Sequence, residues 1–115
     1  MNRLKTVYVL GLLAAVTLLA GCPQRKSISD IMKDPAYYQN REVTVAGTVT
    51  RSFGAMGTGV YEIDDGTGKM WVFAERTGVP SQGAQVASIG KVMPTFSFAG
   101  QSYATVLRER ERKRR

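Results

Sequence analysis

Polar and apolar residues alternate over several short stretches of this 115-residue chain, with the two-residue period of half-buried β-strands. Residues 42–52 (EVTVAGTVTRS) give the clearest case, and Gly47 lies in the middle of them. Residues 84–92 repeat this spacing, with Gly90 at the equivalent position. Because a glycine inside a strand marks a bulge or a bend, both stretches are predicted to be long, bent strands of a sheet that closes on itself.

A hairpin is predicted between these two strands, over residues 59–75 (GVYEIDDGTGKMWVFAE). Its turn is residues 64–68, where aspartates and glycines supply the side-chain hydrogen bonds and positive φ angles that tight turns need. A calcium loop is the alternative, but Gly66 and Gly68 stand where ligands would be required and no glutamate closes the loop. Residues 70–73 (MWVF) are apolar on both faces, so one face is either covered or open to a ligand.

The fifth strand is predicted over residues 101–107, with Tyr103, Thr105 and Leu107 on one face and Ala104 and Val106 on the other. The segments between strands are predicted as a Gly-rich loop at 53–58, a connection without a helix at 76–83, and an aromatic turn at 96–100.

A short helix is predicted before the barrel. Ser27 has the spacing of a helix start, residues 28, 31 and 32 share one face, Pro35 ends the helix, and residues 36–40 form a loop.

Five strands, with the first and fourth bent at glycine and a hairpin between the second and third, are the plan of an OB-fold, a five-stranded Greek-key barrel of the all-β class. Residues 41–107 also resemble the OB domains of nucleic-acid-binding proteins, and especially small bacterial OB-fold proteins with a Tyr-x-x-Asp-Asp-Gly-Thr-Gly hairpin. The chain departs from that pattern in lacking a helix between strands three and four, in Ser88 at an expected apolar position, and in few basic residues where phosphates would bind. The fold hosts many unrelated ligands, so the resemblance implies a fold and not a function.

The N-terminus has the order of a secretory signal: basic residues Arg3 and Lys5, then an apolar run over 7–20 that is short of a membrane span. It ends in Leu19-Ala20-Gly21-Cys22, which resembles the lipobox of bacterial lipoproteins. The resemblance implies a diacylglycerol on the Cys22 sulfur and cleavage just before that residue. The alternative is an ordinary secretory signal with a coincidental cysteine.

The chain is therefore predicted to consist of a signal peptide (1–21), a lipidated N-terminus with spacer and short helix (22–40), a barrel (41–108) and a basic tail (109–115). The mature protein is expected in the cell envelope, anchored to the membrane through lipid on Cys22. Pro23 stands where an aspartate would resemble the inner-membrane retention signal of enterobacterial lipoproteins, which favours the outer membrane if the source has one.

Composition limits the ligands and the catalytic groups that can be expected for this chain. The net charge is +7, but residues 22–107 carry eight basic and seven acidic residues, so the barrel is close to neutral and lacks the excess of cations typical of nucleic-acid binding. There is no histidine, and the single cysteine excludes an internal disulfide. No catalytic residue, metal ligand or cofactor is predicted; an enzyme would have to rely on Glu62, Asp64, Asp65 or Glu75, and is disfavoured.

A ligand is expected on the face of strands two and three. The candidate binding residues are Tyr61, Trp71, Phe73, Phe53, Phe96, Phe98, Arg51 and Lys69. They are predicted to form a platform of rings for stacking; the alternative is that Trp71 and Phe73 are core residues while Met70 and Val72 face outwards. The predicted function is a lipid-anchored, non-catalytic binding module of the envelope for a protein, an oligosaccharide or a small molecule, and the alternative is a nucleic-acid-binding protein.

The tail is predicted to extend as a helix, supported by the pairs Glu109–Lys113 and Glu111–Arg115, and the alternative is a frayed, solvated charged segment. Its functional interpretation is contact with anionic lipid head groups or acidic glycans. Removal of everything after Leu107 is expected to leave the fold intact.

Overall fold

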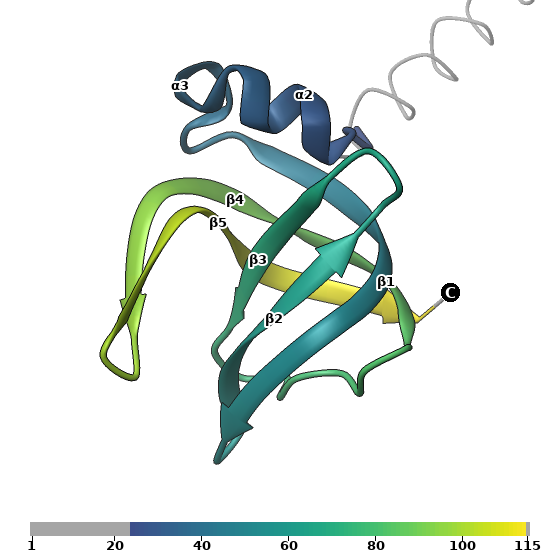
Figure 1. The fold of residues 1–115 in the computed structure, drawn as a ribbon, viewed down its shortest axis with the longest axis vertical. Coiled ribbons are helices and arrows are strands. Elements are labelled where there is room, and N and C mark those ends of the chain that lie inside the picture. The colour runs from purple at the N-terminus through teal and green to yellow at the C-terminus, as the bar shows by residue number, and fades with distance from the viewer. Residues whose placement is uncertain (1–23, 115) are drawn as a thin grey trace, which may run out of the picture.

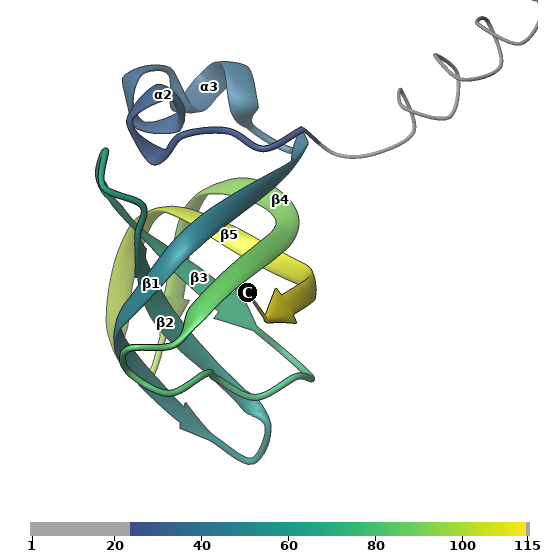
Figure 2. The same cartoon turned by 90° about the vertical axis from the view of Figure 1, so that its right-hand side faces the viewer.

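Five strands close into a barrel, and two short helices cover one end of it (Figures 1 and 2). The computed structural model describes residues 24–114; the predicted signal peptide and Cys22 lie outside this range. In chain order the elements are α2 (Ile28–Lys33), α3 (Pro35–Tyr38), β1 (Glu42–Ala55), β2 (Thr58–Asp64), β3 (Lys69–Ala74), β4 (Gln85–Phe98) and β5 (Gln101–Arg114).

The order of strands around the barrel is β1-β2-β3-β5-β4, and β4 pairs back to β1. All neighbouring strands are antiparallel except β3 and β5, which are parallel. This is the Greek-key arrangement of a five-stranded OB-type barrel, so the predicted fold class is confirmed.

The core lies inside the barrel, where alternate residues of each strand point, and the helix α2 closes its upper end in Figure 1. Ile28 and Ile31 of α2 are fully buried against this core. The other buried members of the core are Val43, Val45, Val49, Tyr61, Ile63, Met70, Val72, Ala74, Val86, Val92 and Leu107.

The helix α2 begins where the sequence predicts, because the Ser27 hydroxyl accepts a hydrogen bond from the Asp30 N–H at 3.2 Å. Met32 does not share its buried face, since it is 38% exposed. α2 ends at Lys33, with Asp34 as its C-cap, just before Pro35 as predicted. The loop predicted at 36–40 is wrong in its first part, because Pro35 opens a second helix, α3, where the missing N–H of proline is harmless and Asp34 caps the helix.

The turn between β2 and β3 also holds the helix in place. One Asp65 carboxylate oxygen accepts hydrogen bonds from the N–H groups of Thr67 (2.8 Å) and Gly68 (3.1 Å), and the other accepts from the Ile28 N–H at 2.8 Å. Burial acts to raise the pKa of the Asp65 carboxyl, but these bonds and one from the Thr67 hydroxyl outweigh it and hold the pKa below its ordinary value. Asp65 therefore serves as a turn residue, as predicted, and as a clamp between the hairpin and α2.

The lowered pKa predicts a loss of stability in acid. A carboxyl with a depressed pKa stabilises the fold above its ordinary pKa, and that contribution disappears as the pH falls through the folded-state value. We expect Asp65→Asn to cost about 1 kcal/mol of unfolding free energy at pH 7, the size of a helix-capping interaction, and the difference to vanish in acid. Urea unfolding from pH 7 to pH 2 measures the free energy of unfolding of both proteins. If the parent and Asp65→Asn lose the same stability as the pH falls, Asp65 does not stabilise the fold through its charged carboxylate.

Two hairpins are longer than the sequence predicts. β1 and β2 meet at a two-residue turn, Met56-Gly57, and β4 and β5 meet at another, Ala99-Gly100. All four turn residues have positive φ, between 51° and 82°. Positive φ at both central positions fits the right-handed twist of paired strands, so these strands continue into segments that were predicted as loops, 53–58 and 96–100.

Gly90 confirms the predicted bend of β4. A Cβ atom at Gly90 would lie 2.1 Å from the Arg108 carbonyl oxygen of β5, and the β4–β5 register shifts at this position. Gly47 is similarly close to the Asp64 carbonyl oxygen, at 2.3 Å, although the register of β1 shifts two residues further on, after Val49. Both glycines let a neighbouring strand approach more closely than a side chain would allow.

The predicted tail is wrong. Residues 109–114 are neither a helix nor a frayed end, although 110, 111, 113 and 114 are exposed. They are the second half of β5, and Arg108 to Arg114 pair with Lys91 to Val86 of β4. The i,i+4 charge pairs suggested a helix, but the same charges alternate with the period of a strand. The barrel therefore runs to Arg114, beyond the predicted boundary at 108.

Candidate functional site

A second apolar cluster lies on the outside of the barrel, separate from the interior core. Val60, Phe73 and Val106 are buried there, and partly buried rings pack against them. We call this surface the aromatic face and define it as Phe53, Val60, Trp71, Phe73, Phe98, Tyr103 and Val106.

The strand register places these residues side by side. Phe53 of β1 pairs with Val60 of β2, which pairs with Phe73 of β3. In the next row Trp71 of β3 pairs with Val106 of β5. Residues paired directly across a sheet project from the same side, so the register alone gathers this cluster.

The rings contact one another in a chain across the face. Phe53 stacks on Trp71 at a centroid distance of 6.2 Å and an angle of 27°, and Trp71 meets Tyr103 at 5.0 Å. Phe73 meets Phe98 at 5.9 Å. Phe73 is only 7% exposed, whereas Phe53 is 55% exposed, so Phe73 forms the floor of the face and Phe53 its accessible rim.

The β4–β5 hairpin supplies Phe98 and Tyr103. The sequence predicted Tyr103 on the same side of its strand as Leu107, which is wrong because Thr105 has a φ of 54° and breaks the alternation. Tyr103 consequently joins Val106 outside the barrel, while Leu107 points inside. Tyr103 was missed as a site residue, since no sequence signal marks a threonine for a left-handed conformation.

An ion pair between the exposed Arg51 and the buried Glu62 borders the aromatic face. Glu62 is 6% exposed; it accepts hydrogen bonds from the Thr50 hydroxyl at 2.7 Å and from Arg51 Nε at 3.3 Å. The Arg51 guanidinium lies 5.3 Å from the centre of the Trp71 ring. The nearest cation to the face is therefore neutralised by a carboxylate, a partner that the sequence analysis did not assign.

The other predicted site residues fall in different places. Met70 and Val72, 1% and 0% exposed, point inwards, so Trp71 and Phe73 project outwards as the platform interpretation requires. Lys69 is exposed at the start of β3, opposite Asp64. The side chain of Phe96 lies outside what the structure describes.

Tyr61 is not part of the platform. It is fully buried inside the barrel, and its hydroxyl donates a 2.5 Å hydrogen bond to Glu109. Burial and the nearby Glu109 carboxylate raise the pKa of the Tyr61 hydroxyl. The alternation around Tyr61 predicted a strand correctly, but it could not say which side of that strand faced inwards.

Glu109 is the centre of a buried polar network. Its side chain is 1% exposed and accepts hydrogen bonds from the Ser88 hydroxyl (2.9 Å) and the Thr77 hydroxyl (2.8 Å), in addition to Tyr61. Arg112 pairs with it at 3.3 Å and donates to the carbonyl oxygens of Thr77 and Gly78. The network explains why Ser88 occupies a position where the OB-fold pattern has an apolar residue, because a hydroxyl is needed there to bind a buried carboxylate.

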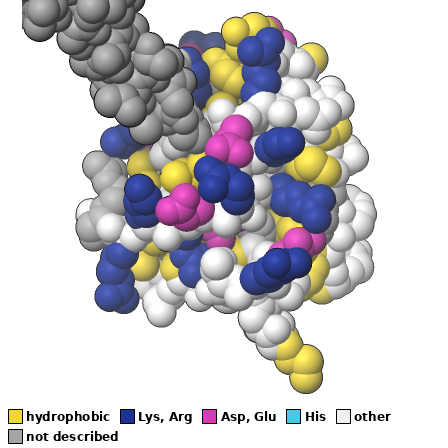
Figure 3. Space-filling view, turned by 180° about the vertical axis from the view of Figure 1, so that it is seen from behind, with side chains coloured by type: hydrophobic (Ala, Val, Ile, Leu, Met, Phe, Trp, Pro, Cys, Tyr) yellow, Lys and Arg dark blue, Asp and Glu magenta, His cyan; other side chains and the backbone are white. Residues whose placement is uncertain are grey.

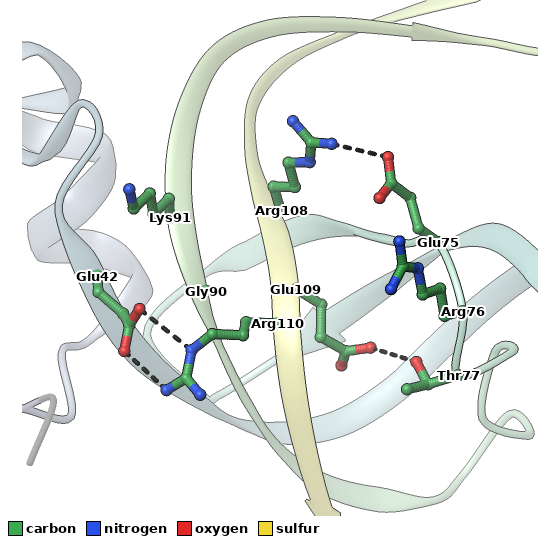
Figure 4. A pocket seen from close by; sticks show the side chains of 9 residues that line it. All are labelled: Glu42, Glu75, Arg76, Thr77, Gly90, Lys91, Arg108, Glu109 and Arg110. Atoms are coloured by element: carbon green, nitrogen blue, oxygen red, sulfur yellow. Dashed lines mark hydrogen bonds and ion pairs between the residues drawn. The ribbon is translucent and has the colours of Figure 1, made fainter.

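The outer surface of β4 and β5 carries interleaved basic and acidic side chains, shown in Figure 3. A hollow of about 400 Å³ lies here (Figure 4). Two ion pairs cross it, Arg108–Glu75 at 2.8 Å and Arg110–Glu42 at 2.8 Å. These exposed pairs connect β5 to neighbouring segments and compensate Arg108 and Arg110, whereas Arg76 and Lys91 also line the hollow and have no ion pair among the described residues.

The acids considered for catalysis do not assemble into a site. Asp64 and Asp65 accept hydrogen bonds within the hairpin turn, Glu62 pairs with Arg51, and Glu75 pairs with Arg108. Within residues 24–114, no group of three or more Cys, Asp or Glu side chains could hold a metal ion. In the same range no helix has the length and apolar character needed to cross a membrane.

Comparison with known proteins supports the fold. No family model matches the chain, and no curated protein matches it. Among solved structures, the chain is similar to OBody AM3L09 bound to hen egg-white lysozyme, with 20% sequence identity and a TM-score of 0.51. The match covers 66% of this chain and 82% of the other, and at this identity it shows a shared barrel fold and nothing about function.

Proposed function

We propose that this chain is a lipid-anchored, non-catalytic binding module of the bacterial cell envelope, and that its aromatic face binds a protein partner. The observation that carries the proposal is the contact of Phe53, Trp71 and Tyr103 on the outer surface of the barrel. Exposed aromatic residues on a rigid sheet are the usual anchors of protein interfaces, because they bury a large area with little loss of side-chain freedom.

The β1–β2 hairpin extends this surface. Met56 at its tip is fully exposed and Phe53 is 55% exposed, and the hairpin protrudes from the barrel at the bottom of Figures 1 and 3. Methionine adapts its shape to irregular apolar surfaces, so an apolar cleft on a partner suits this tip. Among the described residues, no other large hydrophobic side chain is as exposed as Met56.

The charge beside the aromatic face favours a protein over a nucleic acid. Arg51, the cation nearest to this face, is paired with Glu62. Binding to a phosphate backbone relies on unpaired cations, which displace the counterions condensed on the nucleic acid. Proteins present both charges and apolar groups, and they match a face of rings bordered by an ion pair.

The anchor is proposed from the sequence. Leu19-Ala20-Gly21-Cys22 follows a basic start and an apolar run, and Cys22 is the only cysteine. Two or three acyl chains hold a protein stably on a bilayer, whereas a single chain binds reversibly. We expect mass spectrometry of the parent to show a chain that begins at Cys22 and carries a diacylglycerol, and Cys22→Ser to abolish both the lipid and the cleavage.

The binding site is tested with truncated side chains. Trp71→Ala is expected to weaken capture of the envelope partner by at least about 30-fold, equivalent to roughly 2 kcal/mol, the loss typical of a central aromatic anchor. Phe53→Ala should weaken capture with little change in stability, because that ring is more than half exposed. The measurement is cross-linking and pull-down from envelope extract, with folding checked by circular dichroism.

Tyr37→Ala is the matched control, since Tyr37 is 55% exposed but lies on α3, outside the aromatic face. It should capture the partner as the parent does. Equal capture by the parent and the folded Trp71 and Phe53 variants would exclude the aromatic face as the binding site.

A further inference from the structure

A single residue, Pro23, separates the proposed lipid attachment site, Cys22, from the part of the chain that the structure describes. Gln24 and Lys26 run beside β1: the Gln24 carbonyl oxygen accepts a hydrogen bond from the Thr44 N–H at 3.1 Å, and the Lys26 N–H donates to the Thr44 carbonyl oxygen at 2.9 Å. Only Pro23 separates Cys22 from Gln24, and two residues span at most about 7 Å. A lipid on Cys22 would therefore hold the start of β1 at the membrane surface.

This short connection determines which end of the molecule lies at the membrane. α2 and α3 lie at the end of the barrel where β1 begins, and the β1–β2 turn lies at the opposite end (Figures 1 and 2). From Thr44 to Ala55 the strand can extend up to about 35 Å, several times the Debye length of about 8 Å at physiological salt. The helical end is thus close to the lipid headgroups and the tip of the hairpin is far from them.

The helical end has the chemistry of a membrane interface. Met32 and Tyr37 are exposed, at 38% and 55%, and the Arg41 guanidinium lies 4.2 Å from the centre of the Tyr37 ring. Lys33 is also exposed. At the top of Figure 3, hydrophobic and basic side chains lie side by side over these helices. Tyrosine rings favour the headgroup region, where lysine and arginine reach phosphate groups.

Two of the acidic groups at this end accept backbone hydrogen bonds, which hold them in place but do not neutralise their charge. Asp34 accepts a hydrogen bond from the Tyr37 N–H, and Asp65 accepts from the Ile28 N–H. Asp30 is exposed in the first turn of α2. The basic residues of this end are Arg25, Lys26, Lys33 and Arg41.

We propose that the anchored protein rests on the membrane through α2 and α3, with phospholipid headgroups as the partner of this surface, and presents the β1–β2 hairpin away from the bilayer. The inference rests on the proposed lipidation of Cys22. It adds an orientation in which the aromatic face and Met56 are open to a partner standing off the membrane.

The test uses tryptophan fluorescence to measure how close each end of the barrel lies to the lipid headgroups. Trp71→Phe removes the only native tryptophan, and a new tryptophan is placed at one end in Tyr37→Trp or at the other in Met56→Trp. The lipidated proteins are purified from membranes and reconstituted in phosphatidylcholine–phosphatidylglycerol vesicles that contain a headgroup spin-labelled lipid. We expect quenching about twofold or more stronger at position 37 than at 56, given the separation of the two ends.

Equal quenching at both positions, or stronger quenching at 56, would overturn the orientation while leaving the lipid anchor in place. Mass spectrometry of the same samples keeps the two proposals apart. A protein without lipid on Cys22 would overturn the proposed anchor, and the orientation with it. Iodide in the aqueous phase should quench in the reverse order, and circular dichroism confirms that both variants are folded.

Discussion

A chain that stops after Leu107 is expected not to fold. The cut removes half of the paired positions between β4 and β5, from Lys91↔Arg108 to Val86↔Arg114, and opens the barrel along that seam. It also removes Glu109, which leaves the buried Tyr61 hydroxyl and Ser88 hydroxyl without their hydrogen-bond partner. Each orphaned group costs about 1–3 kcal/mol, and the whole domain has only about 5–15 kcal/mol to lose.

Circular dichroism and urea unfolding measure this loss. The matched control is a chain that stops after Arg112, which keeps Glu109 and its ion pair and removes only the last positions of the strand. That chain should unfold cooperatively with at most about 1 kcal/mol less stability than the parent, as expected for a strand end. If the chain that stops after Leu107 unfolds cooperatively with near-native stability, residues 108–114 are not needed to form the barrel.

The barrel was predictable where one face of a strand is apolar. Val43, Val45 and Val49 alternate with polar residues, and the structure buries all three inside. Gly90 marked the bend of β4 because only glycine allows the approach of the Arg108 backbone. Here sequence periodicity and packing respond to the same constraint, which is the removal of one strand face from water.

The second half of β5 gave no such signal. Residues 108–114 contain no apolar residue, and they are held by backbone pairing, by one buried carboxylate, Glu109, and by polar contacts of Arg108, Arg110 and Arg112. A glutamate that points into a barrel has the same appearance in a sequence as one that points into solvent. Its partners Thr77, Ser88 and Arg112 come from three separate segments, and only the folded chain brings them together.

The candidate site was predicted in part for a related reason. Trp71 and Phe73 could be placed on one face of β3 by their spacing, but the spacing does not say which face is outside. Tyr61 was misplaced for this reason. Tyr103 was missed because the positive φ of Thr105 changes the direction of the residues before it, and threonine seldom adopts that conformation.

Replacement of Glu109 by alanine is expected to destabilise the barrel by about 3 kcal/mol or more, the cost of removing one partner of a buried ion pair. The change leaves Arg112, whose side chain is 16% exposed, without its carboxylate, and leaves the Tyr61 hydroxyl buried and unpaired. Glu111→Ala is the matched control, because Glu111 is exposed and its 3.6 Å contact with Arg110 is a surface ion pair worth less than about 1 kcal/mol. Urea unfolding of both variants measures the two losses, and a loss from Glu109→Ala no larger than that from Glu111→Ala would show that the network is dispensable.

If Glu109 holds the network together, adding Tyr61→Phe to Glu109→Ala should cost less stability than Tyr61→Phe alone, since the Tyr61 hydroxyl has already lost its acceptor. Additive losses from the two changes would mean that Tyr61 and Glu109 stabilise the barrel independently of each other.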